Sequence, residues 1–130
     1  MTGSDSSQPH DGPEFDLDRR VFDMVSSTAS RVDPDAPTRF VYHESEGVLW
    51  GEYVGDTVVV GRFCGVRRDA TIDISFVHLG HGDAGTTTGT ATSEISRAED
   101  GALVLTEEFR APDGSLHTSV CREVVGAAPA

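Results

Sequence analysis

Eight short runs of β-branched and aromatic residues, separated by Gly, Asp and Pro, constrain the fold of this chain more than any other feature. They recur at intervals of about 8 to 12 residues, which is typical of all-β domains. No run keeps helical spacing for three turns, although the first could form about two helical turns. The runs are RVFDMVSS (20–27), TRFVYHES (38–45), VLWGEYV (48–54), TVVVGRFCGV (57–66), ATIDISFVHL (70–79), TTTGTATSEI (86–95), ALVLTEEFR (102–110) and LHTSVCREV (116–124).

A meander of these strands can bury one face and remove its edges by closing on itself. We therefore expect a small eight-stranded antiparallel up-and-down barrel, similar in architecture to lipocalins and streptavidin, with room inside for side chains or one small ligand. An open sandwich would use the same strands. One domain is expected over residues 14–125, with disordered tails at 1–13, rich in Ser, Asp, Gly and Pro, and at 126–130.

The charge balance excludes several classes of partner. The formal net charge is −12 at pH 7, so the surface would repel nucleic acid and anionic lipid. No run of 18 apolar residues exists, and the N-terminal residues lack the pattern of a signal peptide. These observations predict a cytoplasmic protein that binds neither nucleic acid nor membranes.

Short turns allow the strand register to be predicted, because side chains alternate strictly between the two faces. Two-residue turns at 46–47, 55–56, 68–69 and 113–114 would align the strands. The polar trio Thr71, Asp73 and Ser75 then points to solvent, so the opposite face is the interior. On this register, the expected interior set comprises His43, Trp50, Glu52, Phe63, Phe76, His78, Glu107 and Arg122.

Titratable residues among aromatic ones suggest a pocket with acid–base chemistry, since burial would move the pKa values of carboxyl and imidazole groups toward neutrality. We predict that the catalytic groups are His78, Glu107, His43 and Glu52. Trp50, Phe63, Phe76 and Arg122 would contact the ligand. The alternative is that Glu107 and Arg122 form a buried ion pair and the histidines lie in water at the barrel mouths.

Other sites have weaker support. His78, His81 and Asp83 include metal-ligand types, but no HExxH motif or cysteine cluster accompanies them, so we expect no metal site. Dinucleotide, P-loop and hydrolase motifs are also absent from the sequence, which predicts a protein without a cofactor. Phe40, Tyr42 and Tyr53 would form an apolar outer surface, and this surface predicts a homodimer.

A family resemblance covers the chain from Phe40 to Val124. This region resembles small bacterial proteins that are often labelled N-acetylglutamate synthase, and it also looks like small lipocalin-like cyclases. An acetyltransferase needs a mixed α/β fold, so the resemblance implies a barrel rather than acyl transfer. The matching residues are Tyr42, His43, Trp50, Tyr53, Gly55, Gly61, His78, Gly89, Glu107 and Glu108.

The resulting functional hypothesis is a cofactor-independent cyclase or isomerase for a small organic, natural-product-like substrate. Pocket shape would orient the substrate, and His or Glu would transfer protons. A non-catalytic carrier or sensor would use the same pocket. A dimeric interaction module, with a barrel filled by its own side chains, is the third hypothesis.

Overall fold

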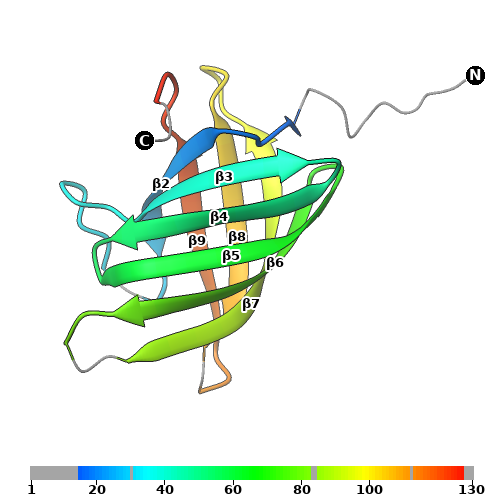
Figure 1. Cartoon of the computed structure of the whole chain (residues 1–130). Coiled ribbons are helices and arrows are strands. Elements are labelled where there is room, and N and C mark those ends of the chain that lie inside the picture. The colour runs from blue at the N-terminus through cyan, green and yellow to red at the C-terminus, as the bar shows by residue number, and fades with distance from the viewer. Residues whose placement is uncertain (1–14, 30, 83–84, 112, 128–130) are drawn as a thin grey trace, which may run out of the picture.

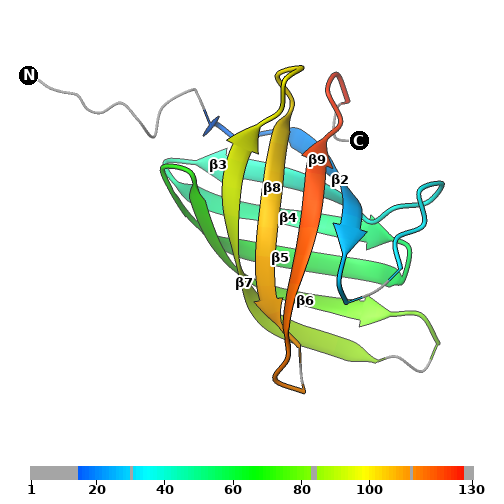
Figure 2. The ribbon, with the colours of Figure 1, turned by 180° about the vertical axis from the view of Figure 1, so that it is seen from behind.

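Each strand pairs with its neighbour in the sequence, and the last strand returns to the first. The computed structural model describes residues 15–29, 31–82, 85–111 and 113–127. Pairing of β9 with β2 closes the barrel, which confirms the predicted antiparallel up-and-down fold and excludes the open sandwich (Figures 1 and 2). The strands are β2 Arg20–Ser27, β3 Arg39–Ser45, β4 Val48–Gly55, β5 Val58–Arg68, β6 Thr71–Gly80, β7 Thr86–Arg97, β8 Leu103–Arg110 and β9 Leu116–Glu123.

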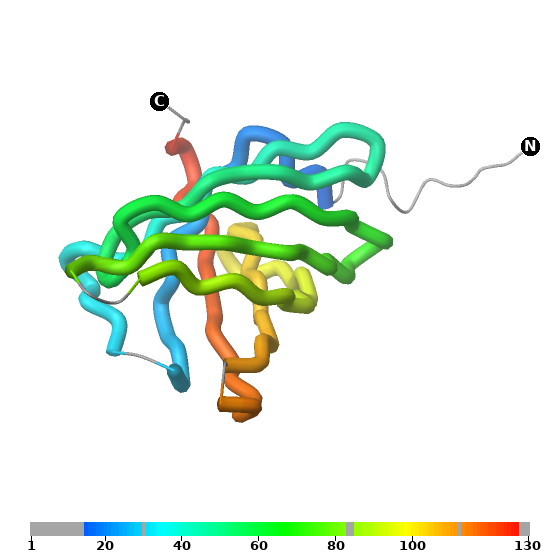
Figure 3. Tube along the Cα trace, turned by 60° about the horizontal axis from the view of Figure 1, so that its bottom comes forward, coloured from blue at the N-terminus to red at the C-terminus, as the bar shows by residue number. Residues whose placement is uncertain are grey.

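All eight strands lie where the sequence pattern predicts them, and the first run is a strand rather than a helix. Figure 3 shows β3 to β6 as successive hairpins of one wall. The predicted tail at 1–13 and residues 128–130 of the second tail lie outside the described residues. In the described ranges, no helix combines the length and the apolar character that a membrane span requires.

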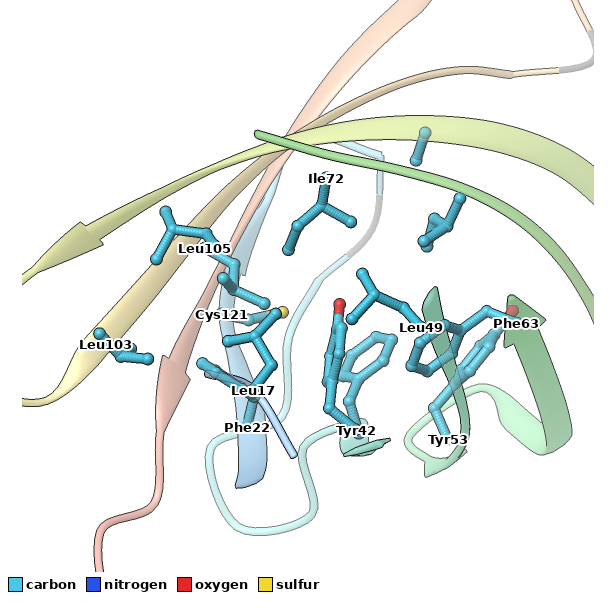
Figure 4. Close-up of a cluster of buried hydrophobic side chains, with 14 of the residues drawn as sticks. Leu17, Phe22, Tyr42, Leu49, Tyr53, Phe63, Ile72, Leu103, Leu105 and Cys121 are labelled. Atoms are coloured by element: carbon cyan, nitrogen blue, oxygen red, sulfur yellow. The ribbon is translucent and has the colours of Figure 1, made fainter. Parts of the chain in front are cut away.

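One end of the barrel, called the closed end below, is filled by apolar side chains. It carries the turns that join β3 to β4, β5 to β6 and β7 to β8. Leu17 precedes β2 and is fully buried in the same cluster as Phe22, Leu49 and Leu103 (Figure 4). The chain segment before β2 therefore plugs this end of the barrel.

Buried charges hold that plug in place. Arg67 on β5 forms an ion pair with Glu44 on β3 at 2.7 Å, and both side chains are at most 5% exposed. The second carboxylate oxygen of Glu44 accepts a hydrogen bond from the Leu17 N–H at 2.9 Å. One acid thus joins two strands to the segment that covers them.

The register of β4 differs from the prediction. Gly55 pairs with Val58, but Tyr53 pairs with Gly61, and β6 passes from Gly80 opposite Val58 directly to Leu79 opposite Val60, so Val59 is an extra residue in β5. A one-residue bulge exchanges the two faces of the strand beyond it. The predicted interior orientation of His43, Trp50 and Glu52 was therefore wrong: these side chains point outward, and the alternate residues of β3 and β4 point inward.

The same correction removes the predicted dimer surface. Phe40, Tyr42 and Tyr53 are 9%, 3% and 6% exposed and belong to the core, so the prediction that they form an outward interface was wrong. The homodimer itself stays a prediction, which would require other residues.

The turn between β8 and β9 is one residue longer than predicted. The Ala111 N–H donates to the Ser115 carbonyl at 2.8 Å, which leaves three residues in the turn. Glu107 consequently pairs with Ser119, and the predicted interior position of Arg122 was wrong. Arg122 forms an ion pair with Asp100 at the outer surface, so no Glu107–Arg122 pair exists.

Interior glycines make room for the aromatic rings of the wall. Gly61 lies opposite Tyr53, and a Cβ atom on Gly61 would stand 2.5 Å from the Tyr53 ring. Gly89 lies opposite Phe76 in the same way, with a corresponding distance of 2.8 Å. These strand glycines therefore fix where two aromatic side chains of the site described below can lie.

Candidate functional site

A cavity of about 290 Å³ opens at the end of the barrel opposite the plug, called the open end below. Its walls are mainly apolar, and a few polar groups converge in it, as in many small-molecule sites. Seven of the eight strands, all except β9, contribute to the lining. The lining residues are Met24, Ser27, Ala29, Thr38, Phe40, Tyr53, Thr57, Val58, Ile74, Phe76, His78, Thr87, Thr88, Glu107, Phe109, Arg110 and Ala111.

Aromatic rings from neighbouring strands form part of the wall. Phe40 on β3 stacks on Tyr53 of β4, with ring centroids 4.9 Å apart and planes 20° apart. On β6, Phe76 and His78 lie nearly parallel at 6.1 Å. The rings therefore present faces and edges suited to a flat or cationic organic group.

Tyr53 and His78 form a polar pair in this wall. The Tyr53 hydroxyl lies 2.9 Å from Nδ1 of His78. Burial raises the pKa of Tyr53, and the charge of Glu107 raises it further. Burial also lowers the pKa of His78. At neutral pH both groups are thus neutral, and the phenol keeps the proton that it can donate to Nδ1.

Glu107 is the acidic group of the cavity. It lies on β8, and its side chain lines the cavity. Protein surrounds most of the carboxyl group, and the part that stays exposed faces the cavity. Burial raises its pKa, and a hydrogen bond donated by Ser119 at 3.1 Å opposes that rise. Within the described residues, no Arg or His side chain lies within ion-pair distance of Glu107.

Further titratable groups surround this carboxyl. Burial raises the pKa of Tyr42 on β3 and of Cys121 on β9, and in both cases the charge of Glu107 adds to the effect. Both groups are therefore neutral at physiological pH. The negative charge of an ionised Glu107 is consequently not balanced by its neighbours.

The mouth of the cavity carries exposed polar residues. Arg110 lines the cavity, and its guanidinium donates to the Gly114 carbonyl in the β8–β9 turn at 2.7 Å. His117 contacts the hydroxyls of Thr28 at 3.2 Å and Ser115 at 2.9 Å. These contacts hold the turn and the end of β2 beside the entrance.

The cavity brings together only some of the predicted site residues. His78, Glu107 and Phe76 line it, whereas Phe63 is buried in the core, 4.6 Å from the Tyr42 ring. On the outer surface, His43 stacks on Trp50 at 5.5 Å, and Glu52 pairs with Arg62 across strands. Arg122 also lies outside the cavity.

Sequence reasoning missed Phe40 and Tyr53 as lining residues, and Ser119 as the partner of Glu107. The alternation of apolar residues that contains Phe40 and Tyr53 is visible in the sequence, but the predicted register placed these two residues on the outer face. In the described part of the chain, no group of three or more metal-ligand side chains comes together. Asp83, which was considered as a ligand, lies outside the described residues.

Comparison with known families supports the barrel. A family model described as "Avidin-like protein" matches residues 15–124, which include all eight strands. No curated protein and no solved structure gave a significant match.

Proposed function

We propose that this chain, which belongs to the Avidin-like protein family, binds one small organic ligand at the open end of its barrel. The observation that carries the proposal is the cavity of about 290 Å³ at that end, opposite a barrel end that is filled. Its size suits a ligand with one or two rings. This is the non-catalytic carrier or sensor function among the sequence hypotheses.

Three probes of similar shape and different charge test this function. Benzylamine is cationic at neutral pH, benzyl alcohol is neutral and benzoate is anionic. We expect saturable binding of at least one probe in calorimetry, because a phenyl ring matches the aromatic walls. Absence of saturable binding by all three would contradict the function.

A pair of variants on β7 places the binding in the cavity. Thr87 lines the cavity at its mouth, whereas Thr90 on the same strand is exposed outside it. Thr87→Trp should fill the entrance and abolish probe binding, and Thr90→Trp should leave binding unchanged. Equal binding by the two variants would locate the probe elsewhere and contradict the proposal.

Proton transfer is the second candidate function, as a cyclase or isomerase. It is favoured by two titratable groups in one cavity, because a carboxyl with a raised pKa, Glu107, can act as a general acid and a neutral imidazole, His78, can act as a general base. NMR of a bound ligand over time would test it. Conversion to an isomer that stops in Glu107→Gln would support catalysis, and a ligand recovered unchanged would oppose it.

The homodimer is a separate proposal that the cavity does not require. Trp50 and Val77 are 45% and 41% exposed on the outer faces of β4 and β6, so they provide apolar area for a contact. Light scattering at micromolar concentration tests it, and a monomeric mass would contradict it.

A further inference from the structure

The charged side chains that line the cavity lie at different depths. Among the described lining residues, Glu107 is the one acid and Arg110 is the one arginine. These are the two lining side chains that can carry a full charge at neutral pH. Arg110 is exposed and bonds to the turn at the mouth, whereas Glu107 is enclosed. A ligand entering the cavity therefore passes the cation and meets the anion inside.

Glu107 has unused hydrogen-bonding capacity. A carboxylate offers about four acceptor positions, and Ser119 fills one of them on Oε1. A buried carboxylate without a cation is costly, since its charge has lost its water. A ligand that supplies both a positive charge and N–H donors would remove that cost.

The surrounding rings favour the same chemistry. Phe76, Tyr53 and Phe109 line the cavity with Glu107, and Tyr53 lies close enough to feel the charge of that carboxyl. Aromatic faces attract ammonium groups, and a carboxylate beside such rings completes a typical cation site. The chain's net charge of −12 would also draw cations and repel anions.

We infer that the natural ligand is an organic ammonium ion, with its charged nitrogen at Glu107 and its apolar part against Phe76, Tyr53 and Phe109. This inference rests on the proposed ligand-binding function and adds the chemical class of the ligand. An anionic ligand would place its charge against Glu107, and a neutral ligand would leave that charge unbalanced.

The three probes also test this class. Benzylamine should bind at least about tenfold more tightly than benzyl alcohol, because a charge-assisted hydrogen bond replaces a neutral one. Benzoate should bind more weakly than either. Tighter binding of benzyl alcohol or benzoate would overturn the ammonium assignment while the binding function stands, whereas no binding by any probe would overturn both.

Two neighbouring glutamates provide a matched pair of variants. Glu107→Gln should bring benzylamine affinity down to that of benzyl alcohol, because it removes the charge and keeps the shape. Glu108→Gln makes the same change in net charge on the exposed side of the strand, and it should keep the preference. An undiminished preference in Glu107→Gln would overturn the inference, and near-ultraviolet circular dichroism confirms that both variants fold.

Proton release gives an independent test of the contact. Because benzylamine favours ionised Glu107, its binding should release protons from the protein below the raised pKa of that carboxyl. The other titratable groups facing Glu107 are Tyr42, Tyr53 and Cys121, which stay protonated, and His78 in the same cavity. Calorimetry in buffers of different ionisation enthalpy should show release that persists in His78→Gln and disappears in Glu107→Gln. Release that depends on His78 instead would contradict the contact.

Discussion

Buried acids at the closed end of this barrel have cationic partners, whereas the acid at the open end has none among the described residues. At the closed end, Glu44 is balanced by Arg67, and Glu123 on β9 is balanced by Arg20 on β2 at 2.6 Å. At the open end, Glu107 has the Ser119 hydroxyl alone as its hydrogen-bond donor among the described residues. The difference indicates that acids at one end hold strands together, while the acid at the other end is left for a ligand.

The largest expected effect lies at the closed end. Arg67→Ala would leave Glu44 buried without its cation, which should lower the free energy of unfolding by about 3 to 5 kcal/mol. Arg68→Ala is the control, since that side chain is 74% exposed and pairs weakly with Asp73. It should cost less than about 1 kcal/mol. Urea denaturation measures the free energy of unfolding of both variants. Equal losses would show that the buried ion pair contributes no more to stability than the exposed one.

The plug gives the next largest effect. Leu17→Ala should lower the free energy of unfolding by about 2 to 3 kcal/mol, because it removes a fully buried side chain from a segment that can partly relax. Leu116→Ala is the matched control, since Leu116 is 56% exposed at the other end of the barrel. Benzylamine affinity should not change in Leu17→Ala. A loss of binding would contradict the separation between the two ends.

The smallest expected effect is a pH dependence that originates at the open end. The raised pKa of Glu107 means that the folded state holds a proton that the unfolded state has already released. Wild-type stability should therefore fall as pH rises from the ordinary glutamate pKa through the raised one. The size of the fall reports how far burial raises this pKa, since each tenfold difference in proton affinity corresponds to about 1.4 kcal/mol.

Glu107→Gln should lack this fall, and Glu108→Gln should keep it. Denaturation curves across that pH range measure the difference between the variants. Parallel curves for wild type and Glu107→Gln would indicate that the carboxyl is not desolvated.

The sequence predicted the strands and the closed barrel but only part of the site. Strand positions follow from composition and turn residues, which are local, and Thr71, Asp73 and Ser75 identified the outer face of β6. Moving a turn along the chain by one residue, as at 68–69, does not exchange the faces. His78 and Phe76 were therefore placed correctly in the interior.

The inner faces of β3 and β4 depend on a single extra residue. That residue is Val59 of β5, which has the same side chain as its neighbours Val58 and Val60, so nothing in the sequence marks it as a bulge. That residue moves Tyr53 inside and Trp50 outside, which changes both the cavity wall and the outer surface. In the same way, one additional turn residue separates Arg122 from Glu107. Which alternate residues of a strand point inward is thus harder to predict than where the strand lies in the sequence.

Mapping the amide chemical shifts of the whole chain during a benzylamine titration tests the central claim most directly. The account predicts saturable shifts at His78, Glu107 and Phe109 around the open end, and none at Leu17 or Arg67 at the closed end. Shifts centred on the closed end or on the outer face at Trp50, or no saturable shifts, would contradict it.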